Sequence, residues 1–132
     1  MDLLEIRHRT ADLLAEKLSL KPGRTLFINA LPPGVQEGVT LSVTGFRPRT
    51  PDNAAECTLE ITGTFEEEAD IFRCLEQLQT LFEQPCPAEF LFWQITGDIR
   101  QSIRTGETMD RNVFQLTATV AFVSKYFGKG FL

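Results

Sequence analysis

Alternation of apolar and polar residues is the clearest pattern along this chain. In Val39–Gly45, three apolar residues alternate with threonine and serine, and Glu56–Gly63 alternates in the same way. A period of two predicts β-strands with one buried and one solvent-exposed face. Runs of β-type character predict strands at Thr25–Leu31, Val39–Gly45, Glu56–Gly63, Ala88–Ile95 and Val113–Val123.

Two other segments have apolar residues at helical spacing. The first helix follows Asp2, a good N-cap residue, with Glu5 as its capping-box partner. The second is expected near Phe65–Glu83, with Thr64 and Glu67 as a second capping box. The predicted buried stripe of the first helix is Leu4, Ala11, Leu14 and Leu18, joined by Leu3, Ile6 and Leu13. That of the second helix is Ile71, Cys74, Leu75, Leu78, Leu81 and Phe82.

The resulting element order is α-β-β-β-α-β-β. It predicts an α+β fold, with a mainly antiparallel sheet of about five strands and two helices packed on one face. The chain has 132 residues, a common size for a single hydrophobic core, so we expect one domain over residues 1–132.

Two segments near the last strands are unusual for an isolated domain. Phe90–Ile95 is apolar on both faces, which predicts a strand that is central in its sheet or covered on its second face by another chain. The polar segment Gly97–Asn112 is expected to form an extended hairpin with its tip at Thr105-Gly106-Glu107. Long polar hairpins on small domains commonly contact partners.

Four arginines and one tryptophan are the candidate interface residues. Arg47 and Arg49 lie in Phe46–Asn53, which has two prolines and is expected to be a protruding loop, whereas Arg104 and Arg111 lie in the polar hairpin segment. The candidate residues for contacts with other subunits or partners are therefore Arg47, Arg49, Trp93, Arg104 and Arg111. Solvated loops are the alternative interpretation, and the segment Leu31–Gly38 is expected to be only a turn-rich connector.

The charge excludes one class of function. The net charge is −5, whereas sequence-independent binding of nucleic acid needs a clustered basic surface. The same charge suits a wall past which DNA slides, because such a wall must repel DNA.

The sequence gives little support for catalysis, metal binding or cofactor binding. His8 is the only histidine, and no Ser-His-Asp set or phosphate-binding loop is present, so we expect no enzyme activity, no metal site and no cofactor. Cys57 and Cys74 fall on apolar faces and are expected to be buried thiols. The first seventeen residues carry charges throughout, so we expect neither a signal peptide nor a membrane span, and a protein that folds in a reducing cytoplasm.

The chain resembles the tail terminator and minor capsid (tail-completion) proteins of long-tailed bacteriophages and prophages. The matching pattern includes the leading helix, Val39-Thr40-Leu41, the strand Leu59–Gly63 entering the second helix, and Gly106 followed by Asp110–Leu116. Residues Lys125–Leu132 have no counterpart in this pattern.

The resemblance implies a structural virion protein rather than an enzyme. Six copies would form a ring that caps the tail tube, ends its polymerisation and contacts the head-completion proteins, with DNA passing through the ring. Assembly would take place in the host cytoplasm, and the ring would lie at the head-proximal end of the tail. Two alternatives remain: another neck or tail-adaptor protein, and a dimeric α+β module that holds a small apolar ligand on its sheet.

Overall fold

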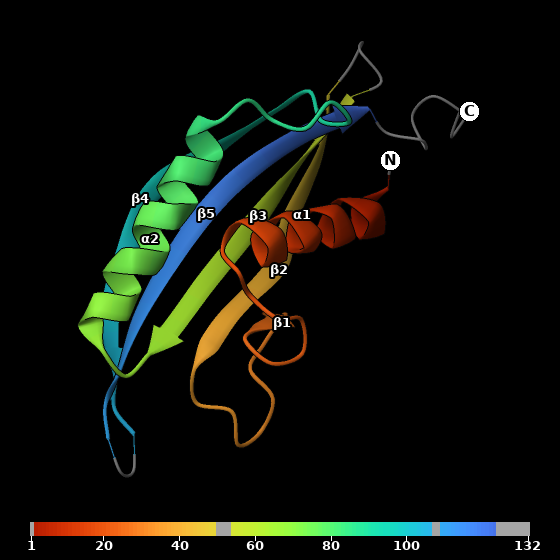
Figure 1. Ribbon diagram of the computed structural model, residues 1–132. Helices are drawn as coiled ribbons and strands as arrows, with labels where there is room; N and C mark the ends of the chain where they lie inside the picture. Colours follow the sequence, from red (N-terminus) through yellow and green to blue (C-terminus); the bar gives the residue numbers. More distant parts are fainter. Residues whose placement is uncertain (1, 50–53, 107–108, 124–132) are drawn as a thin grey trace.

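The computed structural model describes residues 2–49, 54–106 and 109–123, except for the side chain of Arg49, and in these ranges it has two helices and five strands. Their order along the chain is the predicted one (Figure 1). The elements are α1 (Leu3–Lys17), β1 (Leu26–Ile28), β2 (Gly38–Arg49), β3 (Ala54–Phe65), α2 (Glu68–Glu83), β4 (Phe92–Arg104) and β5 (Arg111–Val123).

The strands form one sheet in the order β1-β2-β3-β5-β4. β1 is parallel to β2, and every other neighbouring pair is antiparallel, so the sheet is mainly antiparallel as predicted. Both helices lie on the same face of this sheet, α1 over β2 and α2 over β3, β5 and β4 (Figure 1). The predicted α+β architecture is therefore confirmed.

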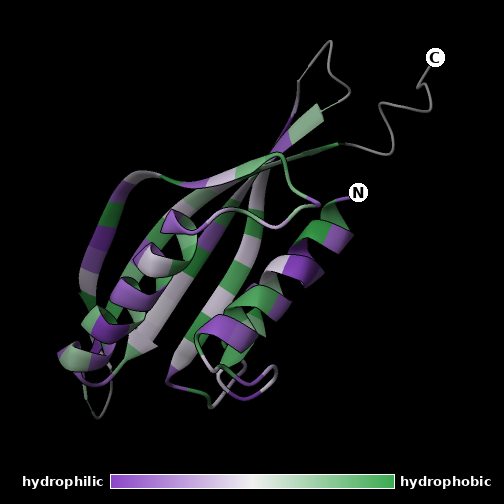
Figure 2. Cartoon of the chain, turned by 45° about the horizontal axis from the view of Figure 1, so that its top comes forward, coloured by the Kyte–Doolittle hydropathy of each residue, from purple (hydrophilic) through white to green (hydrophobic). Residues whose placement is uncertain are grey.

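The core lies between the helices and the sheet face that they cover. Alternation directs Leu59 and Ile61 of β3 and Leu116 and Val120 of β5 to this face, and all four side chains are fully buried. The opposite face carries mainly threonine, serine and charged residues, which Figure 2 shows as pale and purple bands along the strands. The helices bury Ile6, Leu13, Leu14, Ile71, Cys74, Leu75, Leu78 and Leu81.

The helix predictions hold with two corrections. Asp2 is the N-cap of α1, and its side chain accepts a hydrogen bond from the Glu5 backbone N–H at 2.8 Å. Leu4, however, is 55% exposed, because Ile6 takes the buried position in the first turns. The second capping box is wrong: Thr64 belongs to β3, and Glu67 is the N-cap of α2 without a side-chain cap hydrogen bond.

β2 and β4 differ from their predicted bounds. β2 continues through Pro48 to Arg49, so the first half of the expected loop Phe46–Asn53 is strand. A proline can lie here because β1 covers β2 only opposite Val39–Leu41, and beyond that point β2 has no outer neighbour among the described residues. The remainder of that expected loop, residues 50–53, lies outside the described residues.

β4 begins at Phe92 instead of Ala88, because the Phe90 N–H bonds to the Pro87 carbonyl in a turn. It is an edge strand, so the first predicted alternative, a central place in the sheet, is wrong, whereas cover by another chain stays a prediction. The expected hairpin is present: β4 and β5 stay paired as far as Arg104 and Arg111, although the pairing register shifts between Thr96 and Arg100. Within the predicted tip, Glu107 lies outside the described residues, as do Lys125–Leu132.

Candidate functional site

The candidate arginines fall into two groups at opposite ends of the sheet. Arg104 and Arg111 are direct register partners where β4 ends and β5 begins. Arg47 and Arg49 lie near the other end, where Arg49 pairs with Ala54 and Ala54 pairs with Val123. The hairpin therefore brings two of the predicted interface residues together, and the other two form a separate group.

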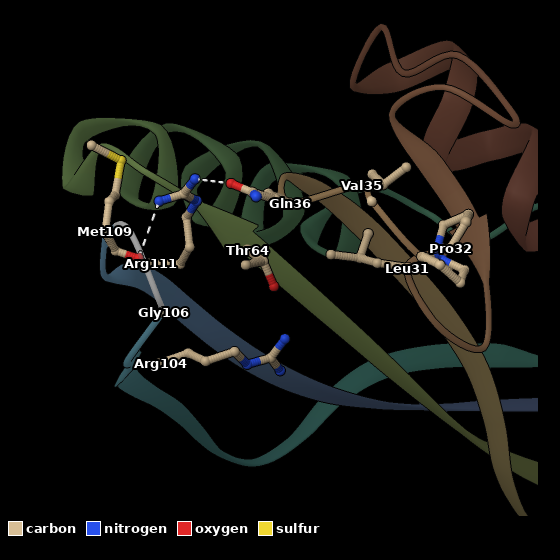
Figure 3. A pocket seen from close by; sticks show the side chains of 11 residues that line it. Leu31, Pro32, Val35, Gln36, Thr64, Arg104, Gly106, Met109 and Arg111 are labelled. Atoms are coloured by element: carbon tan, nitrogen blue, oxygen red, sulfur yellow. Dashed lines mark hydrogen bonds between the residues drawn. The ribbon is translucent and has the colours of Figure 1, made fainter.

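A pocket of about 480 Å³ lies beside Arg104 and Arg111. We call it the arginine pocket; it is lined by Leu31, Pro32, Pro33, Gly34, Val35, Gln36, Thr64, Arg104, Gly106, Met109 and Arg111. In Figure 3 the two arginines lie on the hairpin side, and Leu31, Pro32 and Val35 lie on the other side. The pocket thus combines two cationic groups with an apolar wall.

Arg111 is held by three hydrogen bonds, and one of its nitrogen atoms has no partner among the described residues. Its Nη2 group donates to the Gln36 Oε1 atom, and its Nη1 group donates to the backbone carbonyls of Met109 at 3.4 Å and Asp110 at 3.3 Å. Its Nε–H group is buried and has no acceptor among the described residues. A buried donor without an acceptor is unfavourable, so this guanidinium has capacity for a further oxygen.

No described carboxylate forms an ion pair with the arginines of the pocket. Across residues 2–49, 54–106 and 109–123, no carboxylate lies within ion-pair distance of Arg104 or Arg111. Like charges directly opposite each other on neighbouring strands destabilise the pairing. The arginine pocket is therefore cationic on a protein whose net charge is −5.

The other end of the sheet has a different electrostatic environment. Arg47 pairs across the strands with Glu56, at 2.7 Å between Nη2 and Oε2, and the Arg47 side chain is 75% exposed. Arg47 therefore belongs to a cross-strand ion pair in which its own side chain is exposed and that of Glu56 is only 16% exposed. The side chain of Arg49 lies outside the described residues.

Trp93 belongs to the core of the subunit, contrary to its selection as an interface residue. It is 9% exposed, and its indole N–H donates to the Gln84 carbonyl at 3.0 Å. Its ring lies 5.1 Å from the Phe82 ring and 6.3 Å from the Phe90 ring, centroid to centroid. The turn before β4 and the end of α2 thus cover much of the apolar surface that suggested a covering chain.

The segment Leu31–Gln36 was missed as part of a site. It looks like a turn-rich connector in the sequence, yet it forms the apolar wall of the arginine pocket. Its apolar residues have no regular spacing, so the only local signal was two prolines near Leu31 and Val35, which are half-buried in the structure.

Two of the three cysteine thiols, Cys57 and Cys74, are buried. Burial raises the pKa of the Cys57 thiol to about 11 and that of Cys74 to about 12, so both thiols are protonated at neutral pH. Within the described part of the chain, no three His, Cys, Asp or Glu side chains are grouped so that they could hold a metal ion. Neither described helix has the length and apolar character needed to span a membrane.

Comparison with known proteins assigns the chain to no family. No model of a known protein family matches the chain, and no curated protein matches it.

Proposed function

We propose that the chain is a structural subunit of a phage or prophage tail, which forms a ring that caps the tail tube, ends its polymerisation and contacts the head-completion proteins. The observation that carries this proposal is the edge strand β4. From Gln94 to Arg104, its outer edge faces no other strand among the described residues. An exposed edge is a template for pairing with another chain, and a closed ring would cover it.

The hairpin end adds apolar surface beside this edge. Ile103 is 68% exposed and Met109 is 43% exposed, and both lie close to the arginine pocket. A monomer gains little from such exposed side chains, whereas a neighbouring subunit would remove them from water. The polar second face of the sheet and the net charge of −5 suit a subunit that lines a channel for DNA.

The alternatives are not equally supported. Another neck or tail-adaptor protein would use the same edge and surface, so it remains a close competitor. The dimeric ligand-binding module needs an apolar floor on the open sheet face, yet that face carries Thr58, Thr62, Thr117 and Thr119. The polar character of this face argues against a small apolar ligand.

Light scattering after size-exclusion chromatography, combined with negative-stain microscopy, tests the proposal. The purified protein should form rings of six copies, alone or when mixed with its tail tube protein. Ile103→Lys should prevent assembly, while Leu4→Lys is a matched control on α1, where an apolar residue is 55% exposed. A strict monomer or dimer that never caps tubes, at any concentration, would overturn the proposal.

A further inference from the structure

The paired arginines of the arginine pocket are suited to an anion. Arg104 and Arg111 are register partners whose charges no described carboxylate compensates. An anion bound beside both guanidinium groups would replace their repulsion with attraction. Arginine forms parallel hydrogen bonds to the two oxygens of a carboxylate, which makes a carboxylate a strong ligand for such a site.

Gln36 holds a neutral oxygen at the place where such a ligand would bind. Its Oε1 atom accepts from Arg111 Nη2, while the adjacent Nε–H has no acceptor among the described residues. A carboxylate that displaced the Gln36 amide could accept from both donors. Hydrogen bonds to a charged acceptor are stronger than those to a neutral amide, so this exchange is favourable.

The opposite wall of the pocket restricts the ligand further. Leu31, Pro32 and Val35 offer apolar contacts across from the arginines (Figure 3). A small inorganic anion would leave this wall unused, whereas a peptide can place an aliphatic side chain there next to its carboxylate. Nucleic acid has no branched aliphatic side chain beside its phosphate that could pack on this wall.

We propose that the arginine pocket binds a glutamate or aspartate side chain in a partly apolar segment of a partner protein. The carboxylate replaces the Gln36 amide on Arg111 and also contacts Arg104. The adjacent aliphatic side chain of the segment packs on Leu31, Pro32 and Val35.

Fluorescence anisotropy with two labelled peptides tests this binding. One probe is a short peptide of leucine and glutamate, and the matched probe has glutamine in place of each glutamate. The glutamate peptide should bind at least about tenfold more tightly, the factor that corresponds to one charge-assisted hydrogen bond. Equal binding of the two peptides would overturn the proposal.

Four variants test whether the peptide binds at the arginine pocket. Arg104→Gln and Arg111→Gln should each weaken binding of the glutamate peptide by roughly tenfold or more. Gln36→Glu should also weaken it, because the new carboxylate pairs with Arg111 within the same chain, and it should raise the melting temperature. Arg47→Gln, at the far end of the sheet, is the matched control and should bind normally.

The Gln36→Glu variant tests the proposed binding site even if an arginine variant fails to fold. Unchanged peptide binding by a folded Gln36→Glu variant would contradict the proposed site. A single-stranded oligonucleotide that binds more tightly than the glutamate peptide would also contradict it, in favour of a phosphate ligand. Peptide binding is measured on the isolated subunit, so it can succeed or fail independently of ring formation.

Discussion

Position 63 requires glycine because of a side chain on the neighbouring strand. Gly63 is the register partner of Phe114, and both face the core. A Cβ atom at position 63 would lie 2.1 Å from Phe114 Cε1, far inside van der Waals contact. The phenyl ring is fully buried and therefore cannot easily move away.

Gly63→Ala should therefore destabilise the protein by about 1–3 kcal/mol, the usual cost of overpacking. The Phe114→Leu change, made in the Gly63→Ala background, should recover part of this loss by making room for the methyl group. Urea melts of the two single variants and the double variant measure the coupling. Strictly additive effects would show that the ring does not exclude the methyl group.

The buried thiols link stability to alkaline pH. The pKa values of Cys57 and Cys74 are raised from 9.0 to about 11 and about 12. Both thiols hold their protons more tightly in the folded state, so their contribution is fully present below pH 9 and is lost as the pH rises through the folded values.

The free energy of unfolding should therefore decrease between pH 9 and pH 11, where the thiols ionise mainly in the unfolded chain. Replacing both residues, Cys57→Ala and Cys74→Ala, should reduce the steepness of this decrease. Urea melts at pH 7, 9 and 10.5 compare the two proteins. An identical pH dependence in the variant would rule out the thiols as its source.

At the scale of elements, ion pairs between strands and buried apolar stripes of helices contribute unequally to stability. Arg47 of β2 and Glu56 of β3 form a cross-strand ion pair in which the arginine is exposed, whereas the apolar stripe of α2 packs on the sheet. Exposed ion pairs contribute little, but buried leucines contribute several kcal/mol.

Arg47→Glu should lower stability by about 0.2–1 kcal/mol, because it places two carboxylates directly opposite each other. Arg47→Gln keeps the shape without the repulsion and is the matched control. Thermal melts at low and high salt measure the difference, which should shrink as salt screens the charges. A loss of the same size in both variants would indicate that repulsion is not its cause.

Leu78→Ala should destabilise the protein by about 2–5 kcal/mol, since Leu78 of α2 is fully buried. Leu75, which is 7% exposed, should behave similarly. Glu67→Ala should stay within about 0.5 kcal/mol, because the N-cap side chain makes no hydrogen bond to the helix. Urea melts compare the three variants, and similar losses in all of them would contradict this assignment of the buried stripe.

At the scale of the whole molecule, the sheet has a stable centre and weaker edges. β3 and β5 have partner strands along both sides over most of their length. β1 has only three residues, and from Gln94 onward β4 has no outer partner strand among the described residues. Local opening is easiest where few buried contacts and few strand partners hold the backbone.

Amide hydrogen exchange should follow this arrangement. Protection should be greatest in β3 and β5, and lowest in β1 and in the hairpin segment Arg100–Arg104. Mass spectrometry of peptic fragments, or NMR, measures the exchange rates. Strong protection of Arg100–Arg104 at concentrations where the protein is a ring, lost on dilution, would instead place this edge in a subunit contact.

Much of the fold was predictable because its signals are local. The order of elements, the Asp2 cap and the burial of Leu75 and Leu78 follow from periodicity and capping over a few residues. Each signal concerns neighbours in sequence, whose spacing determines which side chains share a face. The hairpin after Gly97 was also predictable, since its two strands are close in sequence.

Four features were not predictable in this way. They are the edge position of β4, the strand residues around Pro48, the burial of Trp93 and the pocket between Arg104 and Leu31. Each depends on which distant segments pack together, and that choice minimises the free energy of the whole chain rather than of any short window. Periodicity shows that a strand buries one face, but it does not show which strand lies beside it. Local residue patterns thus specified the elements, while long-range packing specified the edges, the pocket and the surfaces open to a partner.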